Sequence, residues 1–151
     1  MYTFFLSLLF PAHKDPYENI YCVVRGHKDI ILHPPSDLPW MRYKDLKPCV
    51  YKRNEESGKL EAKLIEGMDP VPWVTIDPTL PKQSQSADYA KYANPTRVRV
   101  EAGDALYLPS LWFHHLEQSH GCIAVNYWYD MEFDSKYVHY NLLNRLSNKI
   151  S

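Results

Sequence analysis

Short segments of alternating and β-branched residues, separated by turns rich in proline and glycine, limit what this chain can fold into more than any other feature of its sequence. Residues 19–25 and 28–33 flank the turn Gly26-His27 and predict a β-hairpin. Residues 36–47 are predicted to form a loop anchored by Trp40. The same strand pattern recurs at residues 49–52, 59–65, 70–77, 97–101, 105–108, 112–118 and 122–129.

One segment has a different period. Residues 133–150 repeat apolar side chains at helical spacing, which predicts a C-terminal helix, and residues 81–95 read as a loop with one helical turn. Many short strands followed by a single terminal helix indicate an all-β barrel or sandwich.

The composition of the 151 residues is that of one globular domain. The net charge is −1 and no block of like charge is present, which argues against a nucleic-acid partner. The apolar run Met1–Phe10 is shorter than the roughly 20 residues needed to cross a bilayer, so no membrane association is predicted. Three scattered cysteines favour a reduced chain in the cytoplasm or nucleus, with one intermolecular disulfide as the alternative.

A candidate metal site is formed by His13-Lys14-Asp15 and the distant His114. In a strand, positions i and i+2 point to the same side, so His13 and Asp15 share one face. Two imidazoles and one carboxylate on one face of a metal suit Fe(II), with Mn, Co or Zn as substitutes, and leave positions open for a co-substrate and dioxygen. A His-x-Asp pair by itself also arises by chance in a chain with seven histidines.

Three longer segments resemble one protein family. They are HKDPYENIYCVVRGHKDIILHPPSD at His13–Asp37, GDALYLPSLWFHH at Gly103–His115 and CIAVNYWYD at Cys122–Asp130. These segments resemble the JmjC oxygenases, and within them the small hydroxylase branch, over about residues 13–147. The resemblance implies a double-stranded β-helix, which is the jelly-roll or cupin-like barrel, with a C-terminal helix. It also implies Fe(II)- and 2-oxoglutarate-dependent hydroxylation of a protein or peptide, with a lysine side chain as the target.

The resemblance also implies roles for individual residues. His13, Asp15 and His114 match the iron ligands, and no catalytic group beyond this metal centre is implied. Lys28 matches a lysine that binds the distal carboxylate of 2-oxoglutarate. An ammonium group inside a barrel is costly without a partner, and this carboxylate would be one. The plain alternative for Lys28 is a solvated lysine at a sheet edge.

The rest of the co-substrate pocket is implied by the same resemblance. Asn19 and Asn126 match polar residues near 2-oxoglutarate, and Trp128 matches an aromatic wall of its pocket. Without the resemblance, Asn126 and Trp128 would be interpreted as ordinary strand residues. Surface or structural positions are expected for the other histidines, which are His27, His33, His115, His120 and His139.

The N-terminal part departs from the family's pattern. In the family, a hydroxylated residue three positions before the first histidine bonds 2-oxoglutarate, and Phe10 occupies this position without a hydroxyl to donate. The family also has a longer N-terminal region, with a tyrosine for the co-substrate and strands that complete the barrel. We therefore expect an incomplete barrel with an unpaired edge, low stability and weakened 2-oxoglutarate binding.

These observations divide the chain into three predicted parts. Residues 1–12 are an atypical apolar leader, residues 13–131 are the C-terminal part of the JmjC catalytic core, and residues 132–151 are the C-terminal helix. The leader has two interpretations, a buried β-strand that leads to His13 or a translated, pyrimidine-rich splice-acceptor tract.

Two functions of different kinds are compatible with the sequence. The first is the protein hydroxylase described above. The second is a shortened, catalytically inactive chain that acts as an interaction module and forms a homodimer through its terminal helix, as related hydroxylases do. The family resemblance adds peptide cleavage, but the sequence contains no paired nucleophile and base, so only the metal site would support it.

Overall fold

The computed structural model describes residues 10–80 and 86–150 of the chain. Its strands are β1 (Phe10–Lys14), β2 (Tyr17–Arg25), β3 (His27–His33), β4 (Tyr43–Leu46), β5 (Cys49–Arg53), β6 (Leu60–Leu64), β7 (Val71–Val74), β8 (Thr96–Glu101), β9 (Ala105–Leu108), β10 (Phe113–Gln118) and β11 (Ile123–Asp130). Its helices are the 3-10 helix η1 (Pro35–Trp40), α1 (Ala87–Tyr92) and α2 (Ser135–Ile150).

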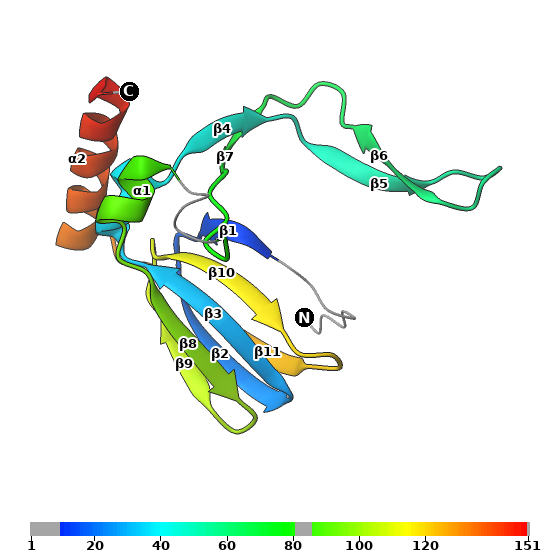
Figure 1. Ribbon diagram of the computed structural model, residues 1–151, viewed down its shortest axis with the longest axis horizontal. Coiled ribbons are helices and arrows are strands. Elements are labelled where there is room, and N and C mark those ends of the chain that lie inside the picture. The colour runs from blue at the N-terminus through cyan, green and yellow to red at the C-terminus, as the bar shows by residue number, and fades with distance from the viewer. Residues whose placement is uncertain (1–9, 81–85, 151) are drawn as a thin grey trace.

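Two antiparallel sheets form the body of the fold. The larger has the strand order β1-β10-β3-β8, and the smaller has the order β11-β2-β9 and lies behind it in Figure 1. The chain crosses between the sheets from β1 to β2, from β2 to β3, and again at β9, β10 and β11. This is the crossing pattern of a jelly roll, and with α2 at its end it confirms the predicted β-barrel with a C-terminal helix.

Alternate residues of the two sheets fill the space between them. In β2, residues Asn19, Tyr21 and Val23 are buried while their neighbours are less so, as the two-residue period of a strand requires. The buried apolar side chains of this core are Tyr21, Val23, Ile30, Leu32, Val100, Leu108, Leu116 and Cys122. The two-residue spacing of apolar residues along a strand therefore determines which face of the sheet is apolar.

The predicted hairpin of residues 19–25 and 28–33 is wrong. β2 and β3 are two strands, as expected, but they belong to different sheets and pair with other strands. Only Gly26, with φ of +74°, separates them. The two-residue loop of a hairpin is therefore missing, and at Gly26 the chain bends from the smaller sheet into the larger one.

A second apolar cluster lies where the sheets meet the helices. Leu38 and Met41 from the η1 region pack there with Phe113 of β10 and Tyr140 of α2. α2 packs along η1, on the left of Figure 1, which fixes the predicted C-terminal helix against the barrel. The predicted loop 36–47 is largely ordered as η1 and β4, since β4 gains its structure from pairing with the distant β7.

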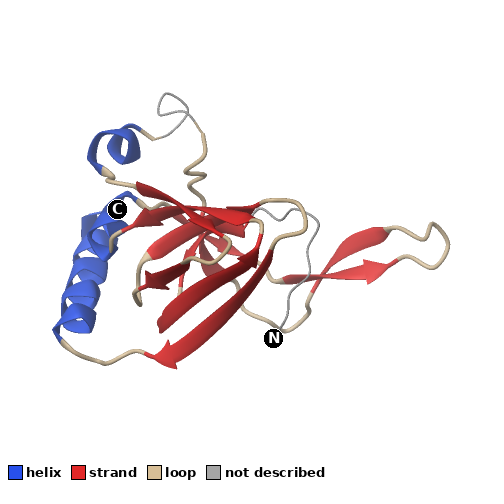
Figure 2. Ribbon diagram, turned by 90° about the horizontal axis from the view of Figure 1, so that it is seen from below, coloured by secondary structure: helices blue, strands red, loops and turns tan. Residues whose placement is uncertain are grey.

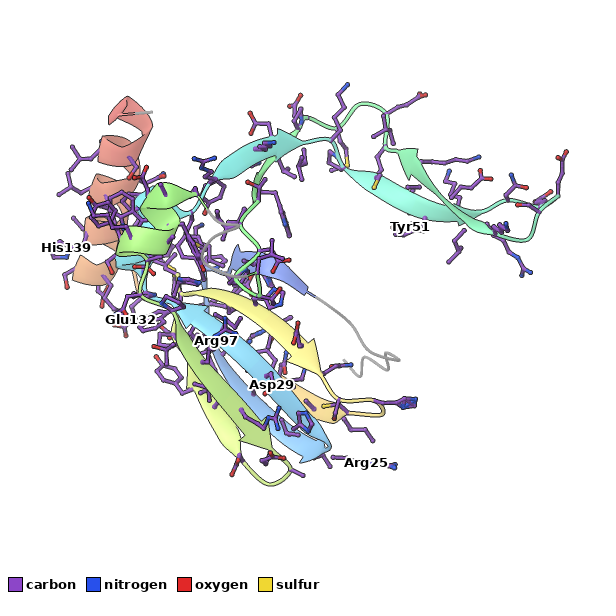
Figure 3. The ribbon with its side chains drawn as sticks, viewed as in Figure 1. Arg25, Asp29, Tyr51, Arg97, Glu132 and His139 are labelled. Atoms are coloured by element: carbon purple, nitrogen blue, oxygen red, sulfur yellow. The ribbon has the colours of Figure 1, made fainter. Side chains whose placement is uncertain are left out.

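Residues of β4 to β7 form an arm that extends away from the sheets (Figures 1 and 2). It consists of two ribbons of two strands each, β4 with β7 and β5 with β6. All side chains of β5 and β6 are exposed. Tyr51, labelled at the right of Figure 3, is 71% exposed.

The ends of the chain test the sequence expectations only in part. The first nine residues of the predicted leader lie outside the described residues, whereas Phe10 to Lys14 form β1. β11 pairs with β2 alone among the described strands, and its Tyr127, Trp128 and Tyr129 are exposed. None of the described helices has the length and apolarity needed to cross a bilayer.

Candidate metal centre

The three predicted metal ligands come from two neighbouring strands. His13 lies in β1, Asp15 follows the end of this strand, and His114 lies near the start of β10. In the antiparallel ladder of β1 and β10, His13 is directly opposite His114. Residues directly opposite in such a ladder point to the same side, so the pairing itself brings the two imidazoles together.

The ligand atoms of these three side chains lie within 4.8 Å of one another. Asp15 Oδ2 is 3.9 Å from His13 Nε2 and 3.8 Å from His114 Nε2. These separations are too long for hydrogen bonds. They suit donors that surround a metal ion at about 2.1 Å each. Within the described residues, no other three His, Cys, Asp or Glu side chains meet in this way.

His114 is prepared to act as a ligand. Its side chain is 1% exposed, and its Nδ1 donates a hydrogen bond to the Trp112 carbonyl oxygen at 3.1 Å. This fixes the tautomer in which Nε2 carries the lone pair, and Nε2 is buried without a hydrogen-bond partner among the described residues. Burial, helped by the nearby His13, lowers the pKa of His114 from 6.5 to about 4. A neutral imidazole with an unpartnered nitrogen facing a carboxylate and a second histidine fits a divalent metal.

Lys28 lies farther inside the barrel, on β3. Leu32 is opposite His114, so Lys28 is four residues along β3 from the ligand, about 13 Å at the usual strand rise. Its side chain is buried, and its Nζ donates to Gln118 Oε1 at 3.2 Å and lies 5.4 Å from the centre of the Tyr21 ring. Burial lowers its pKa, and none of the described carboxylates forms an ion pair with it. The solvated edge position, the alternative for Lys28, does not occur.

The other predicted co-substrate residues separate into a buried and an exposed group. Asn19 is 2% exposed, and within the described part of the chain neither polar atom of its amide has a hydrogen-bond partner. Asn126 and Trp128 lie on the same side of the smaller sheet, opposite Tyr21 and Asn19 respectively. They are exposed because β11 is an edge strand, and Trp128 stacks on Tyr17 with ring centres 6.4 Å apart.

Two aromatic residues near the site were not predicted. Tyr21 faces Lys28 across the barrel, and its position two residues after Asn19 is the signal that could have identified it. Trp73 of β7 stacks against His13, with ring centres 6.2 Å apart and an angle of 16° between the rings. It comes from the arm, so no local pattern connects it with His13.

The remaining histidines lie outside the triad. His33 is fully buried, and its ring bonds Asp37 at 2.9 Å and the Tyr89 hydroxyl at 3.1 Å, which ties β3 to η1 and α1. His115 is buried on the face of β10 opposite to His114. The others are partly or fully exposed, and they are His27, His120 and His139 (His139 in Figure 3).

Comparisons with a family model and with individual proteins point to the same family. The sequence model of the cupin-like domain matches residues 7–135. The Homo sapiens protein named bifunctional peptidase and (3S)-lysyl hydroxylase JMJD7 is 49% identical over 135 residues, which cover 89% of this chain and 42% of that protein. Lysine-specific demethylase JMJ32 of Arabidopsis thaliana is 38% identical over 149 residues, covering 92% of this chain and 43% of the relative. JmjC domain-containing protein E of Dictyostelium discoideum is 38% identical, covering 87% and 42%. The chain therefore spans less than half the length of each of these relatives.

Proposed function

We propose that this chain, which belongs to the family of cupin-like JmjC domains, is an Fe(II)- and 2-oxoglutarate-dependent protein hydroxylase. The observation that supports it most is the convergence of His13, Asp15 and His114 where β1 ends and β10 begins. Fe(II) bound there supplies the activation of dioxygen, in an overall reaction that converts O2, 2-oxoglutarate and a C–H bond into succinate, CO2 and a hydroxyl group.

The protein's own contribution is to hold and orient the ligands. His114 is neutral because it is buried, and its bond to the Trp112 carbonyl oxygen turns Nε2 toward Asp15. Asp15 contributes the anionic ligand, and His13 approaches from the adjacent strand. Together these residues would hold Fe(II) through three protein ligands and leave room at the ion for the co-substrate and dioxygen.

Lys28 is proposed to bind the distal carboxylate of 2-oxoglutarate. A buried ammonium group without an anionic partner is unfavourable, and a carboxylate would satisfy both its charge and its hydrogen bonds. Asn19 has unpartnered amide atoms in the same interior and is proposed to contact the co-substrate, with Asn126 and Trp128 at its open side.

The proposed target is a lysine side chain in a protein or peptide. This proposal depends on the human relative, whose name states lysyl hydroxylase activity, and not on a contact in this structure. Peptide cleavage, also in that name, is less favoured because among the described residues no nucleophile and base form a pair beside the metal ligands.

The test is turnover of 2-oxoglutarate to succinate by the chain loaded with Fe(II), with and without a lysine-containing peptide. The peptide should gain the mass of one oxygen atom on lysine. His13→Ala should abolish turnover, and Lys28→Met should raise the KM for 2-oxoglutarate roughly 10- to 100-fold, the value of a hydrogen bond to a charged group. His120→Ala, an exposed histidine outside the site, is the matched control. Equal turnover by the His13 and His120 variants would contradict the proposal.

The second candidate function is an interaction module that dimerises through α2. Val138, Leu142 and Leu146 are exposed and follow one another at four-residue spacing, whereas Tyr140 faces the core. This apolar stripe would be buried if the α2 helices of two copies packed together. Leu142→Asp should then convert a dimer to a monomer in light scattering, and Asn141→Asp, with the same charge beside the stripe, should not.

A further inference from the structure

The turn that leads into β10 contains a strained residue next to the candidate metal centre. Leu111 has a φ of +66°, the one left-handed non-glycine residue in the described part of the chain. This conformation is unfavourable for a leucine, so the surrounding contacts must hold it in place. The turn matters because His114 follows it by three residues.

Two adjacent residues of this turn are bonded to the segment that carries Asp15. The Leu111 amide donates to the Asp15 carbonyl oxygen at 2.9 Å. Ser110 donates twice to the Glu18 carboxylate, through its amide at 3.0 Å and through its hydroxyl at 2.9 Å. The two ligand-bearing segments, far apart in the sequence, are thus linked at two neighbouring points.

Glu18 is well suited to hold the turn. Its side chain is 18% exposed, and it accepts further hydrogen bonds from the Tyr107 hydroxyl at 2.6 Å and from Lys136 Nζ at 3.4 Å. Although burial acts to raise the pKa of Glu18, hydrogen bonds from Tyr107 and Ser110 hold it below its ordinary value. A carboxylate that is ionised and fully bonded is a rigid acceptor for the Ser110 donors.

We infer that Glu18 is a positioning residue of the metal centre, which acts through Ser110 to keep the Ser110–Trp112 turn in the shape that sets His114 opposite His13 and near Asp15. The inference rests on the proposed function, because it assigns Glu18 a part in metal binding. Glu18 acts through its hydrogen bonds to Ser110, and its effect reaches His114 through the backbone of the turn.

The experiment measures binding of Mn(II) alone, from the loss of the free-ion EPR signal, for the whole chain and its variants. Glu18→Ala should raise the Kd for Mn(II) about tenfold, the lower end of the range for residues that orient metal ligands. Glu18→Gln should restore a Kd near that of the parent, because its amide oxygen can accept from the Ser110 amide and its amide nitrogen can donate to the Ser110 hydroxyl. Ser110→Ala should raise the Kd in the same direction by less.

Tyr107→Phe is the matched control, since it removes a bond from the same carboxylate without touching the turn. It should leave the Kd for Mn(II) unchanged even if it lowers the melting temperature. An unchanged Kd in a folded Glu18→Ala variant, or an equal rise in Tyr107→Phe, would overturn the inference. If Glu18→Ala does not fold, Ser110→Ala decides the question, and a Kd for Mn(II) equal to that of the parent would overturn the inference.

The proposed function is tested separately in the same titration by His13→Ala. Equal Mn(II) binding by the parent and by His13→Ala would remove the metal site itself, and the role of Glu18 with it. If His13→Ala loses Mn(II) binding while Glu18→Ala keeps the Kd of the parent, the metal site is supported and only the positioning role of Glu18 is rejected.

Discussion

Burial decides the protonation of His114 before a metal ion is considered. With 1% of its side chain exposed, the charged imidazolium has lost its hydration, and His13 beside it disfavours a second positive charge. The lone pair of Nε2 is therefore available near neutral pH. The same burial leaves this nitrogen without a partner, so the side chain contributes little stability of its own until a ligand is bound.

A pH dependence of the metal-free chain follows from this residue. Unfolded His114 takes up a proton near pH 6.5 and folded His114 near pH 4, so between these values the unfolded state binds more protons. Protonation of His114 therefore leaves the free energy of unfolding unaffected above about pH 6.5 and lowers it as the pH falls toward 4, by an amount on the order of 3 kcal/mol. Urea unfolding of the parent at several pH values measures this slope. His114→Gln should flatten it and exposed His120→Gln should not, so equal slopes in all three chains would contradict the assignment.

The corner between β2 and β3 decides the topology at the scale of the element. A single residue, Gly26, carries the chain from the smaller sheet to the larger. The turn from β10 to β11 packs against it, since the Ser119 amide donates to the His27 carbonyl oxygen at 3.0 Å and the Ser119 hydroxyl accepts from the His27 amide at 2.9 Å. Two crossings between the sheets therefore stabilise each other at one corner.

Gly26→Ala tests this corner. An alanine at this position would have to keep the positive φ of Gly26. Its Cβ would also collide with the Ser119 hydroxyl and crowd the Cα of Cys122. Gly67 has a similar φ of +76° but open space around it, so Gly67→Ala measures the backbone strain alone, roughly 1 to 2 kcal/mol. Gly26→Ala should cost about 1 to 3 kcal/mol more because of the overpacking. Denaturant unfolding measures the loss of unfolding free energy in both variants. Similar losses would show that Ser119 and Cys122 move aside at little cost.

The sequence predicts elements better than it predicts their partners. Residues 19–25 and 28–33 are correctly predicted as strands, and in β2 every second side chain is buried. The same residue pattern occurs in a hairpin and in strands of two separate sheets, so it does not identify the partner strand. β4 was missed because its four residues are all exposed and carry no apolar period.

The same limit applies to the candidate site. His13 and Asp15 share a side by local geometry, whereas Trp73 reaches His13 through the fold of the arm. The roles of Ser110 and Glu18 have no local signature either, because they arise from contacts between distant segments. Only the family resemblance predicts a co-substrate role for Lys28 and Asn19, which the sequence pattern alone would have left as strand residues.

At the scale of the molecule, the described residues form a barrel, helices at one end of it and an arm with little support. β5 and β6 form a ribbon of two strands, and one of its faces presents Tyr51, Leu60 and Leu64 to solvent. Two isolated strands are marginally stable in water. The arm should therefore open far more often than the barrel, although Trp73 at its base lies against the candidate metal centre.

Limited trypsin digestion should reveal this difference. The first cuts are expected at Lys52, Arg53, Lys59 or Lys63 in the arm, and the barrel should survive them as an intact assembly of fragments. Arg25 and Arg99, exposed residues of the barrel sheets, serve as internal references and should be cut much later. Mass spectrometry of early time points identifies the sites, and early cleavage at Arg99 would contradict the expectation.

The pairing of β1 with β10 has a consequence for the order in which the chain is assembled. Among the described strands, β1 pairs in a sheet with β10 alone, and β10 leaves the ribosome long after β1. Throughout this interval β1, which contains His13, has no strand to pair with, because β10 and its His114 have not been synthesised. A site that needs both histidines can therefore be completed only after β10 has been synthesised, when most of the barrel already exists.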